Sequence, residues 1–354
     1  MGGVKVVARR TRVRSLAVVV GALVAGTALV ASPSSAGADE PLFIGWSDLL
    51  PSFTTTYEPN SANECTSGRP KCVDAVIKEM TRREQPLEDS CNHNTMFALM
   101  YLRTTQEYQR SATTPGFFTD PNFINHQDAV FAQKYFDAWD AYRSGDLAHT
   151  PKAWQIAFAA ADGQKVMGIG NMLLGMSAHV NRDLPYTLAE IGLVKPDGTS
   201  RKPDHDKVNQ FLNVVMEPLL HEAATRFDPS VDDAQVYGTT MDETAMLQLL
   251  VGWREQAWRN AEALVNAPTP EARALVEAEI ERVAAVEADL IQYATSYSPG
   301  NLPQILGELA SLGAQPSQTM QAQADRASNS LHGLLGNLLT PGATLRNQYC
   351  ASHG

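Results

Sequence analysis

A histidine and a carboxylate stand one helical turn apart in this sequence, at His179 and Asp183. Side chains four residues apart lie on the same face of a helix, and Gly168, Met172 and Gly175 continue that face toward the interior. Such a pair can bind one metal ion, or the carboxylate can orient the imidazole through a hydrogen bond. A third interpretation is a buried polar pair that ends a helix and holds the next loop.

Asp128 is the second candidate, because it stands among aromatic residues on one helical stripe. Burial of an unpaired charge is costly, so we expect a partner: a metal ion, Arg182 or the ring of His179. His126 falls on a different face, where we expect it to be exposed. The stripe consists of Ile124, Asp128, Phe131, Tyr135, Ala138 and Tyr142.

The third candidate is the run Asp204-His205-Asp206. Adjacent His and Asp side chains bind metal in helical metal-dependent phosphohydrolases, whereas an Asp before a helix usually caps its N-terminus. Asn209 lies one turn inside the same helix and is expected to face the same pocket.

These candidates together favour a metal-assisted hydrolase that acts on an ester or phosphoester of a small or lipid-like molecule. A divalent ion, with zinc favoured, would lower the pKa of a bound water and polarise the ester. The competing hypothesis is an exported, non-enzymatic binding protein whose buried His/Asp cluster only fixes helix packing. The expected metal ligands are His179, Asp183, Asp128 and Asp206, the expected catalytic residues are His179, Asp183 and Asp128, and the expected substrate-binding residues are Asn181, Arg182 and Asn209.

Helical periodicity dominates from about residue 71, and we find no convincing run of alternating strands. Asp120-Pro121 predicts the start of one helix, Gly145 its end, and Pro185 the end of another. The pattern predicts an all-α fold: one multi-helix, bundle-like domain over 71–354. Helices are expected at about 72–83, 90–110, 121–142, 151–161, 163–183, 205–226, 240–265, 270–297, 302–312 and 317–339, with Thr240 and Glu243 as a capping box.

The first 38 residues have the pattern of an export signal. Residues 1–14 carry five basic and no acidic side chains, 16–31 are apolar, and 32–38 end in Ala-Gly-Ala. This order predicts cleavage after Ala38 and a secreted, extracellular protein without a stable membrane span. A retained membrane anchor is the alternative. Residues 39–70, rich in Pro, Ser, Thr and Asn, are expected to form an extended arm.

The charge balance argues against a nucleic-acid partner. The 354 residues carry a net charge of −11, and without residues 1–38 the net charge becomes −16. Non-specific binding to nucleic acid or anionic membranes requires clustered Lys and Arg. The sequence also lacks the GxSxG, P-loop, HExxH and EF-hand patterns.

Four cysteines favour disulfides in an exported protein, and four allow three pairings. We favour Cys65–Cys72 as a short loop closure and Cys91–Cys350 as a link between the chain ends.

Three segments together resemble a family of uncharacterised bacterial proteins, over roughly residues 75–265. The resemblance implies a helical domain and carries no known activity. The segments run from Phe118 to Phe136, from Gly175 to Pro185 and from Asp204 to Asn209.

A motif-level similarity points to the secreted zinc-dependent phospholipase C and single-strand nuclease class. In that class a His and an Asp four apart on a helix bind zinc, as His179 and Asp183 would. The sequence departs from the class pattern, because Leu184 and Pro185 follow where a second His is expected and Trp46 lies inside the predicted start. The resemblance therefore implies at most a one-metal or two-metal site.

Overall fold

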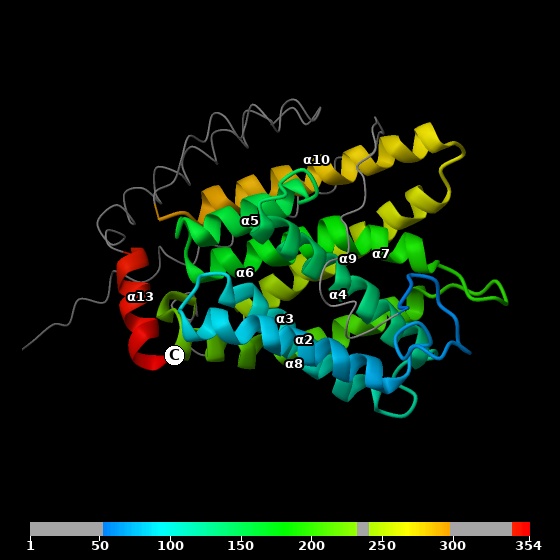
Figure 1. Ribbon diagram of the computed structural model, residues 1–354, viewed down its shortest axis with the longest axis horizontal. Helices are drawn as coiled ribbons and strands as arrows, with labels where there is room; N and C mark the ends of the chain where they lie inside the picture. Colours follow the sequence, from blue (N-terminus) through cyan, green and yellow to red (C-terminus); the bar gives the residue numbers. More distant parts are fainter. Residues whose placement is uncertain (1–51, 232–240, 298–341) are drawn as a thin grey trace, which may run out of the picture.

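The computed structural model describes residues 52–231, 241–297 and 342–354 (Figure 1). Over these residues the chain is helical and contains only two isolated bridges, with no strand, so the all-α prediction is confirmed. The predicted export signal, the capping box at Thr240 and the helices predicted at 302–312 and 317–339 lie outside the described residues.

The helices begin and end close to the predicted bounds in most places. They are α2 (Pro70–Asp89), α3 (Thr95–Ala112), α4 (Pro121–Ser144), α5 (Lys152–Asp162), α6 (Gly168–Ser177), the π-helix η2 (Ala178–Asp183), α7 (Leu184–Ile191), α8 (Lys202–Arg226), the 3-10 turn η3 (Pro229–Val231), α9 (Met241–Val265), α10 (Pro270–Thr295) and α13 (Gly342–His353).

The predicted signals at both ends of α4 are confirmed. The Asp120 side chain accepts a hydrogen bond from the backbone N–H of Phe123 at 3.3 Å, and Pro121 occupies the first turn. Gly145 ends the helix with φ of 83°, a left-handed conformation that glycine adopts without a steric cost. These signals fix where the Asp128 side chain can lie.

Two groups of helices enclose the core (Figure 1). Along one long edge α10 packs against α5 and α6, and along the other α3 packs against α2 and α8. Between these edges α9 packs against α7 and η2. Large side chains such as Trp154, Trp253 and Phe136 are fully buried there.

The helix predicted over 163–183 differs from the prediction at its C-terminal end. Pro185 does not end it: α6 continues through η2 directly into α7, with Pro185 in the first turn of α7. A proline lacks the N–H and clashes with the carbonyl four residues earlier, here that of Asn181. The wider π turn immediately before Pro185 accommodates this mismatch, so one helical path runs past the proline.

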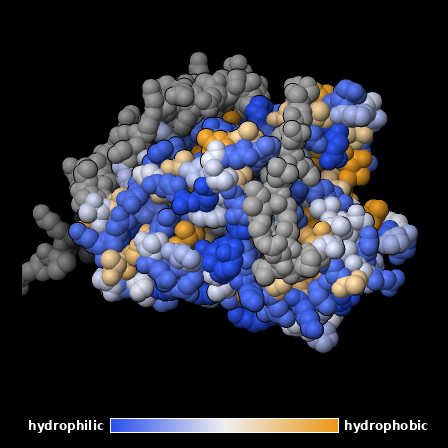
Figure 2. Space-filling view, viewed as in Figure 1, coloured by the Kyte–Doolittle hydropathy of each residue, from blue (hydrophilic) through white to orange (hydrophobic). Residues whose placement is uncertain are grey.

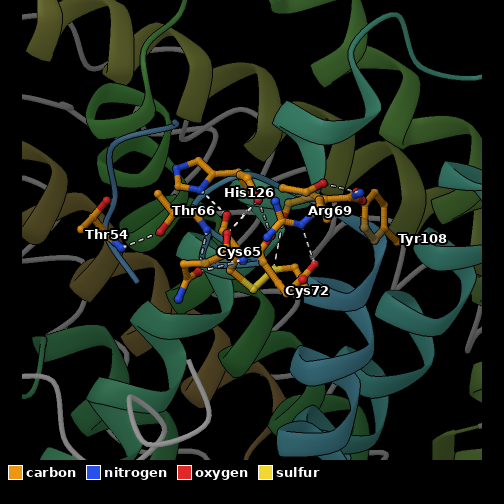
Figure 3. The surroundings of a disulfide bond; sticks show 12 residues. Thr54, Cys65, Thr66, Arg69, Cys72, Tyr108 and His126 are labelled. Atoms are coloured by element: carbon orange, nitrogen blue, oxygen red, sulfur yellow. Dashed lines mark hydrogen bonds and ion pairs between the residues drawn. A yellow bond between two sulfur atoms is a disulfide. The ribbon is translucent and has the colours of Figure 1, made fainter. Parts of the chain in front are cut away.

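The described part of the arm, residues 52–69, covers the N-terminal half of α4 (Figure 3). The Cys65–Cys72 disulfide links the end of this arm to the first turn of α2. The expectation that His126 is exposed was wrong, because the arm buries it: its two ring nitrogens lie 2.7 and 2.8 Å from the carbonyl oxygens of Cys65 and Thr55.

The second disulfide, Cys91–Cys350, joins α13 to the segment before α3. Both favoured cysteine pairings are therefore confirmed. The face in Figure 2 is mostly hydrophilic, with apolar side chains in small separate groups. In the described ranges, every helix is too short or too polar to cross a bilayer.

Candidate functional site

A deep, mostly apolar pocket lies between α3, α4, η2, α8 and α9. Its volume is about 100 Å³. Its polar lining groups include His179, Asp128, Tyr101 and Arg254. The apolar wall is formed by Phe97, Met100, Ile124, Phe131, Met176, Val180, Leu184, Val208, Phe211, Leu212, Val215, Met216, Leu219 and Leu250.

His179 and Asp183 form the imidazole–carboxylate pair that their spacing allows. The His179 Nδ1 lies 2.9 Å from Asp183 Oδ2, and both residues are buried. Trp154 Nε1 donates to the same oxygen at 2.9 Å, and Arg182 donates to the other oxygen at 3.1 Å. Both oxygens of Asp183 therefore accept hydrogen bonds, and one of them orients the ring of His179.

The pKa shifts of this pair define its protonation. Burial would raise the pKa of Asp183, but the hydrogen bond from His179 and the charge of Arg182 outweigh it and hold that pKa below its ordinary value. Burial lowers the pKa of His179 despite the neighbouring carboxylate. Neutral His179 therefore donates Nδ1–H to an ionised Asp183, and its Nε2 keeps a free lone pair.

Aromatic rings hold the imidazole in place. Phe131 stacks on it with ring centres 3.5 Å apart, and Tyr101 meets it edge-on at 4.5 Å. Phe97 lies 5.9 Å away, directly over Gly175, where an added Cβ would come within 2.3 Å of the Phe97 ring. The small residue at 175 thus lets Phe97 reach the pocket wall.

Three polar atoms around the pocket have no hydrogen-bond partner within the described residues: His179 Nε2, Tyr101 Oη and Asp128 Oδ2. All three residues line the pocket. Buried polar atoms are paired in most folded proteins, so three unpaired ones around one cavity indicate a place for a polar ligand group or water.

Asp128 and Tyr101 are both shifted toward their neutral forms. Burial raises the pKa of Asp128 to about 7 and that of Tyr101 well above its ordinary value. Below pH 7 both groups can therefore donate a hydrogen bond into the pocket. The expected partner of Asp128 is not Arg182, which pairs with Asp183 and Glu281.

Arg254 brings a positive charge to the pocket wall. It is 5% exposed, and it donates to Asn209 Oδ1 at 2.8 Å and to the His205 carbonyl at 2.6 Å. Across residues 52–231 and 246–297, no carboxylate forms an ion pair with it. Burial lowers its pKa to about 10, so it remains charged at neutral pH.

The other predicted substrate-binding residues lie elsewhere. Asn181 points away from the pocket and donates to Glu287 Oε2 at 2.5 Å, and Arg182 donates to Glu281 at 2.8 Å. Both residues face α10 and fix its packing on η2. Asn209 holds Arg254 without lining the pocket itself.

The run at 204–206 does not join the pocket. Asp204 accepts hydrogen bonds from the backbone of Thr119 and Asp120, which ties the start of α8 to the start of α4. Asp206 is exposed and paired with Lys202 at 2.8 Å. It is therefore separate from His179, Asp183 and Asp128, with which we expected it to share a metal ion.

In the ranges that the structure describes, no group of three or more His, Cys, Asp or Glu side chains is arranged to hold a metal ion. The divalent ion, with zinc favoured, stays a prediction. Asp183 is poorly placed as a metal ligand, since its two oxygens already accept three hydrogen bonds.

Two residues of the site were not predicted from the sequence: Tyr101 and Arg254. Each carries a recognisable signal, because Tyr101 follows the core residue Phe97 by four and Arg254 follows Leu250 by four. A charged residue at a core spacing is the same kind of signal that identified Asp128.

The fold and site define an all-α protein, cross-linked by two disulfides, with a His–Asp pair at an apolar internal pocket. The chain belongs to a family of unknown function, DUF5995, which matches residues 73–293. This match confirms the resemblance to an uncharacterised family. No comparison supports the similarity to the zinc-dependent phospholipase C class, and neither the curated proteins nor the solved structures contain a match.

Proposed function

We propose that the protein is an exported hydrolase that cleaves a carboxylic ester in the pocket, with His179 as general base. The observation that carries this proposal is the buried, unpaired Nε2 of His179, a residue of the pocket lining, while Asp183 holds the opposite ring nitrogen. General-base catalysis requires a base held in one tautomer within reach of the substrate, and a carboxylate-held imidazole in the wall of a pocket supports that role.

The proposed reaction uses one water molecule. His179 Nε2 removes a proton from water as the water oxygen attacks the ester carbonyl carbon. The resulting oxyanion accepts hydrogen bonds from Tyr101 Oη or protonated Asp128. The bond to the alcohol oxygen then breaks, and protonated His179 returns the proton to that oxygen, which gives an acid and an alcohol. Asp183 stabilises the charged ring throughout.

The chemistry of the lining favours a carboxylic ester over a phosphoester. A phosphoester carries permanent charge, and its recognition usually draws on several cations. Arg254 is the one cationic side chain among the described lining residues, which are otherwise apolar or neutral polar with the exception of Asp128 and His179. An uncharged ester group fits beside His179 at a lower desolvation cost.

The apolar lining also supports the second candidate, a binding protein without catalysis. In that case the pocket would hold an apolar small molecule, and the His–Asp pair would only fix η2 against α5. The two disulfides support an exported protein in both cases, because such bonds persist in oxidising compartments.

The test is hydrolysis of p-nitrophenyl esters of increasing acyl length by the purified chain and its His179→Gln variant. We expect wild-type activity that rises with acyl length and a loss of roughly 10²–10⁴-fold in the variant. The control is His149→Gln, since His149 forms a similar pair with Asp146 at 2.6 Å on the surface, away from the pocket.

Two results would overturn the proposal. One is wild-type hydrolysis no faster than buffer across the series, and the other is unchanged activity in folded His179→Gln. Metal analysis of the same preparation, with activity before and after chelation, tests the predicted divalent ion separately.

A further inference from the structure

The pocket has one permanent charge, that of Arg254, which forms no ion pair among the described residues. Arg254 is buried, and its side chain contacts the Asn209 side chain, the His205 carbonyl and, at 3.4 Å, His205 Nδ1. The charge of Asp206 also acts on it, although Asp206 is exposed and paired with Lys202. His205 is itself neutral, because burial holds its pKa well below the ordinary value. A buried charge without a directly paired counter-ion is costly, and an anionic ligand group would reduce that cost.

Asp128, the lining residue that could act as counter-ion, is not placed to do so. Across the described residues it forms no ion pair with Arg254, and one of its oxygens has no partner at all. The charge of Asp128, which lies on α4, acts instead on Tyr101 and Tyr108 of α3 and raises the pKa of both.

Arg254 and His179 both line the pocket, Arg254 from α9 and His179 from η2. His179 lies beside Tyr101, with the two ring centres 4.5 Å apart. Arg254 is held by Asn209 of α8, and Phe211 of the same helix places its ring centre 5.9 Å from that of Tyr108 on α3. Tyr101 and Tyr108 are seven residues apart in α3, which corresponds to about 10 Å of helix rise.

Apolar side chains line the space along this direction. One face of α8 contributes a row at helical spacing, and α3 contributes the opposite wall. Within this row no charged side chain occurs. The row consists of Val208, Phe211, Leu212, Val215, Met216 and Leu219.

We propose that the pocket binds an elongated aliphatic molecule with one carboxylate, and that Arg254 receives the carboxylate while the apolar chain extends along α8 past His179. This inference rests on the proposed function, since it identifies the ester substrate as one with an aliphatic body and a carboxylate at some distance from the ester. Arginine binds carboxylates through two parallel hydrogen bonds, which sets the direction in which the molecule enters.

The test measures binding without hydrolysis, by calorimetric titration of the full chain with dodecanoate and with 1-dodecanol below their aggregation limits. We expect dodecanoate to bind about tenfold or more tightly than the alcohol, and Arg254→Met to lose that preference while it still binds the alcohol. The control is Arg259→Met, on the same helix, where the side chain is exposed and paired with Glu255.

A purely structural role for Arg254 predicts a different pattern. In that case Arg254→Met would weaken both ligands alike, or the wild type would bind both equally, and either result overturns the inference. If Arg254→Met does not fold, Arg254→Lys is the second variant, because it retains the charge without the paired hydrogen bonds. In the wild type, the affinity for dodecanoate is also compared with the affinities for dodecyl sulfate and dodecyltrimethylammonium. Tighter binding of dodecanoate than of either decides the ligand class. Loss of ester hydrolysis alone would overturn the proposed function and leave this binding preference intact.

Discussion

At the scale of single residues, the site depends on the hydrogen bonds that the Asp183 carboxylate accepts. Its carboxylate accepts hydrogen bonds from His179, Trp154 and Arg182 and is completely buried. The spacing of His179 and Asp183 was compatible with a shared metal ion or with a direct pair. Of the neighbours that decide between these options, Arg182 directly precedes Asp183, whereas Trp154 comes from α5, so local sequence could not reveal the contact with Trp154.

Replacement of Asp183 tests the pair directly. Asp183→Asn keeps the shape but removes the charge that faces Arg182 and adds an NH₂ group toward existing donors. We expect a loss of about 2–3 kcal/mol in the free energy of unfolding, because buried donors lose their charged acceptor while Arg182 keeps its ion pair with Glu281. Urea unfolding measures it. A loss below 1 kcal/mol would mean that the carboxylate is not ionised in the fold.

Asp128 predicts a pH dependence with a definite sign. Its pKa is raised to about 7 in the fold from an ordinary 3.8. Between about pH 4 and pH 7 the folded chain therefore holds a proton that the unfolded chain has lost, so stability falls as the pH rises. Above pH 7 the full cost of the buried charge applies.

Asp128→Asn should remove this dependence, because the amide stays neutral. We expect the variant to exceed the wild type by roughly 4 kcal/mol at pH 8 and by almost nothing at pH 4. Urea unfolding at pH 4, 6 and 8 measures the difference. The exposed Asp206→Asn serves as control, and an equal difference at pH 4 and pH 8 would contradict the assignment.

At the scale of elements, the helix that carries His179 combines close packing with an irregular turn. The glycine-rich α6 lets Phe97 approach its backbone, η2 presents His179, and Pro185 follows within one turn. The helices, the α4 caps and the close approach at the glycines could be predicted from periodicity and residue type. The π turn could not, because it depends on how a proline is accommodated in a packed helix, and such turns often occur at functional sites.

Gly175→Ala tests the close packing. Its Cβ would meet the Phe97 ring at 2.3 Å, so the ring must move into the pocket. We expect a loss of about 1–3 kcal/mol in stability and weaker ligand binding. Gly252→Ala is the matched control, because nothing lies within 4 Å of its added Cβ, and there we expect a gain of about 0.5–1 kcal/mol. Equal effects at both sites would contradict the packing account.

At the scale of the whole molecule, the Cys91–Cys350 disulfide joins parts of the chain 259 residues apart and holds α13 on the bundle. Inside α13, buried Arg346 donates to Asn171 at 2.7 Å, which links this helix to α6. The residue count predicted disulfides with three possible pairings, and the favoured pairing of a short loop closure and a link between the chain ends is confirmed. The role of Arg346 could not be predicted, since its partner on α6 is distant in sequence.

Removal of the two disulfides should have unequal effects. On a chain-entropy basis, Cys91→Ser with Cys350→Ser costs roughly 5 kcal/mol, and Cys65→Ser with Cys72→Ser roughly 2 kcal/mol. Thermal unfolding measures the order, and hydrogen exchange should show α13 losing protection first in the former variant. An equal loss in both variants would contradict the long-loop role of Cys91–Cys350.

The central claim is that His179 presents an unprotonated Nε2 to a ligand in the pocket. Nitrogen-15 NMR of the ring, titrated with pH and with dodecanoate, tests it most directly. The account predicts a neutral ring with Nδ1 protonated at pH 7, still neutral at pH 6, and an Nε2 resonance that shifts when the ligand binds. A ring that is charged at pH 7, or an Nε2 resonance that does not respond to bound ligand, would contradict it.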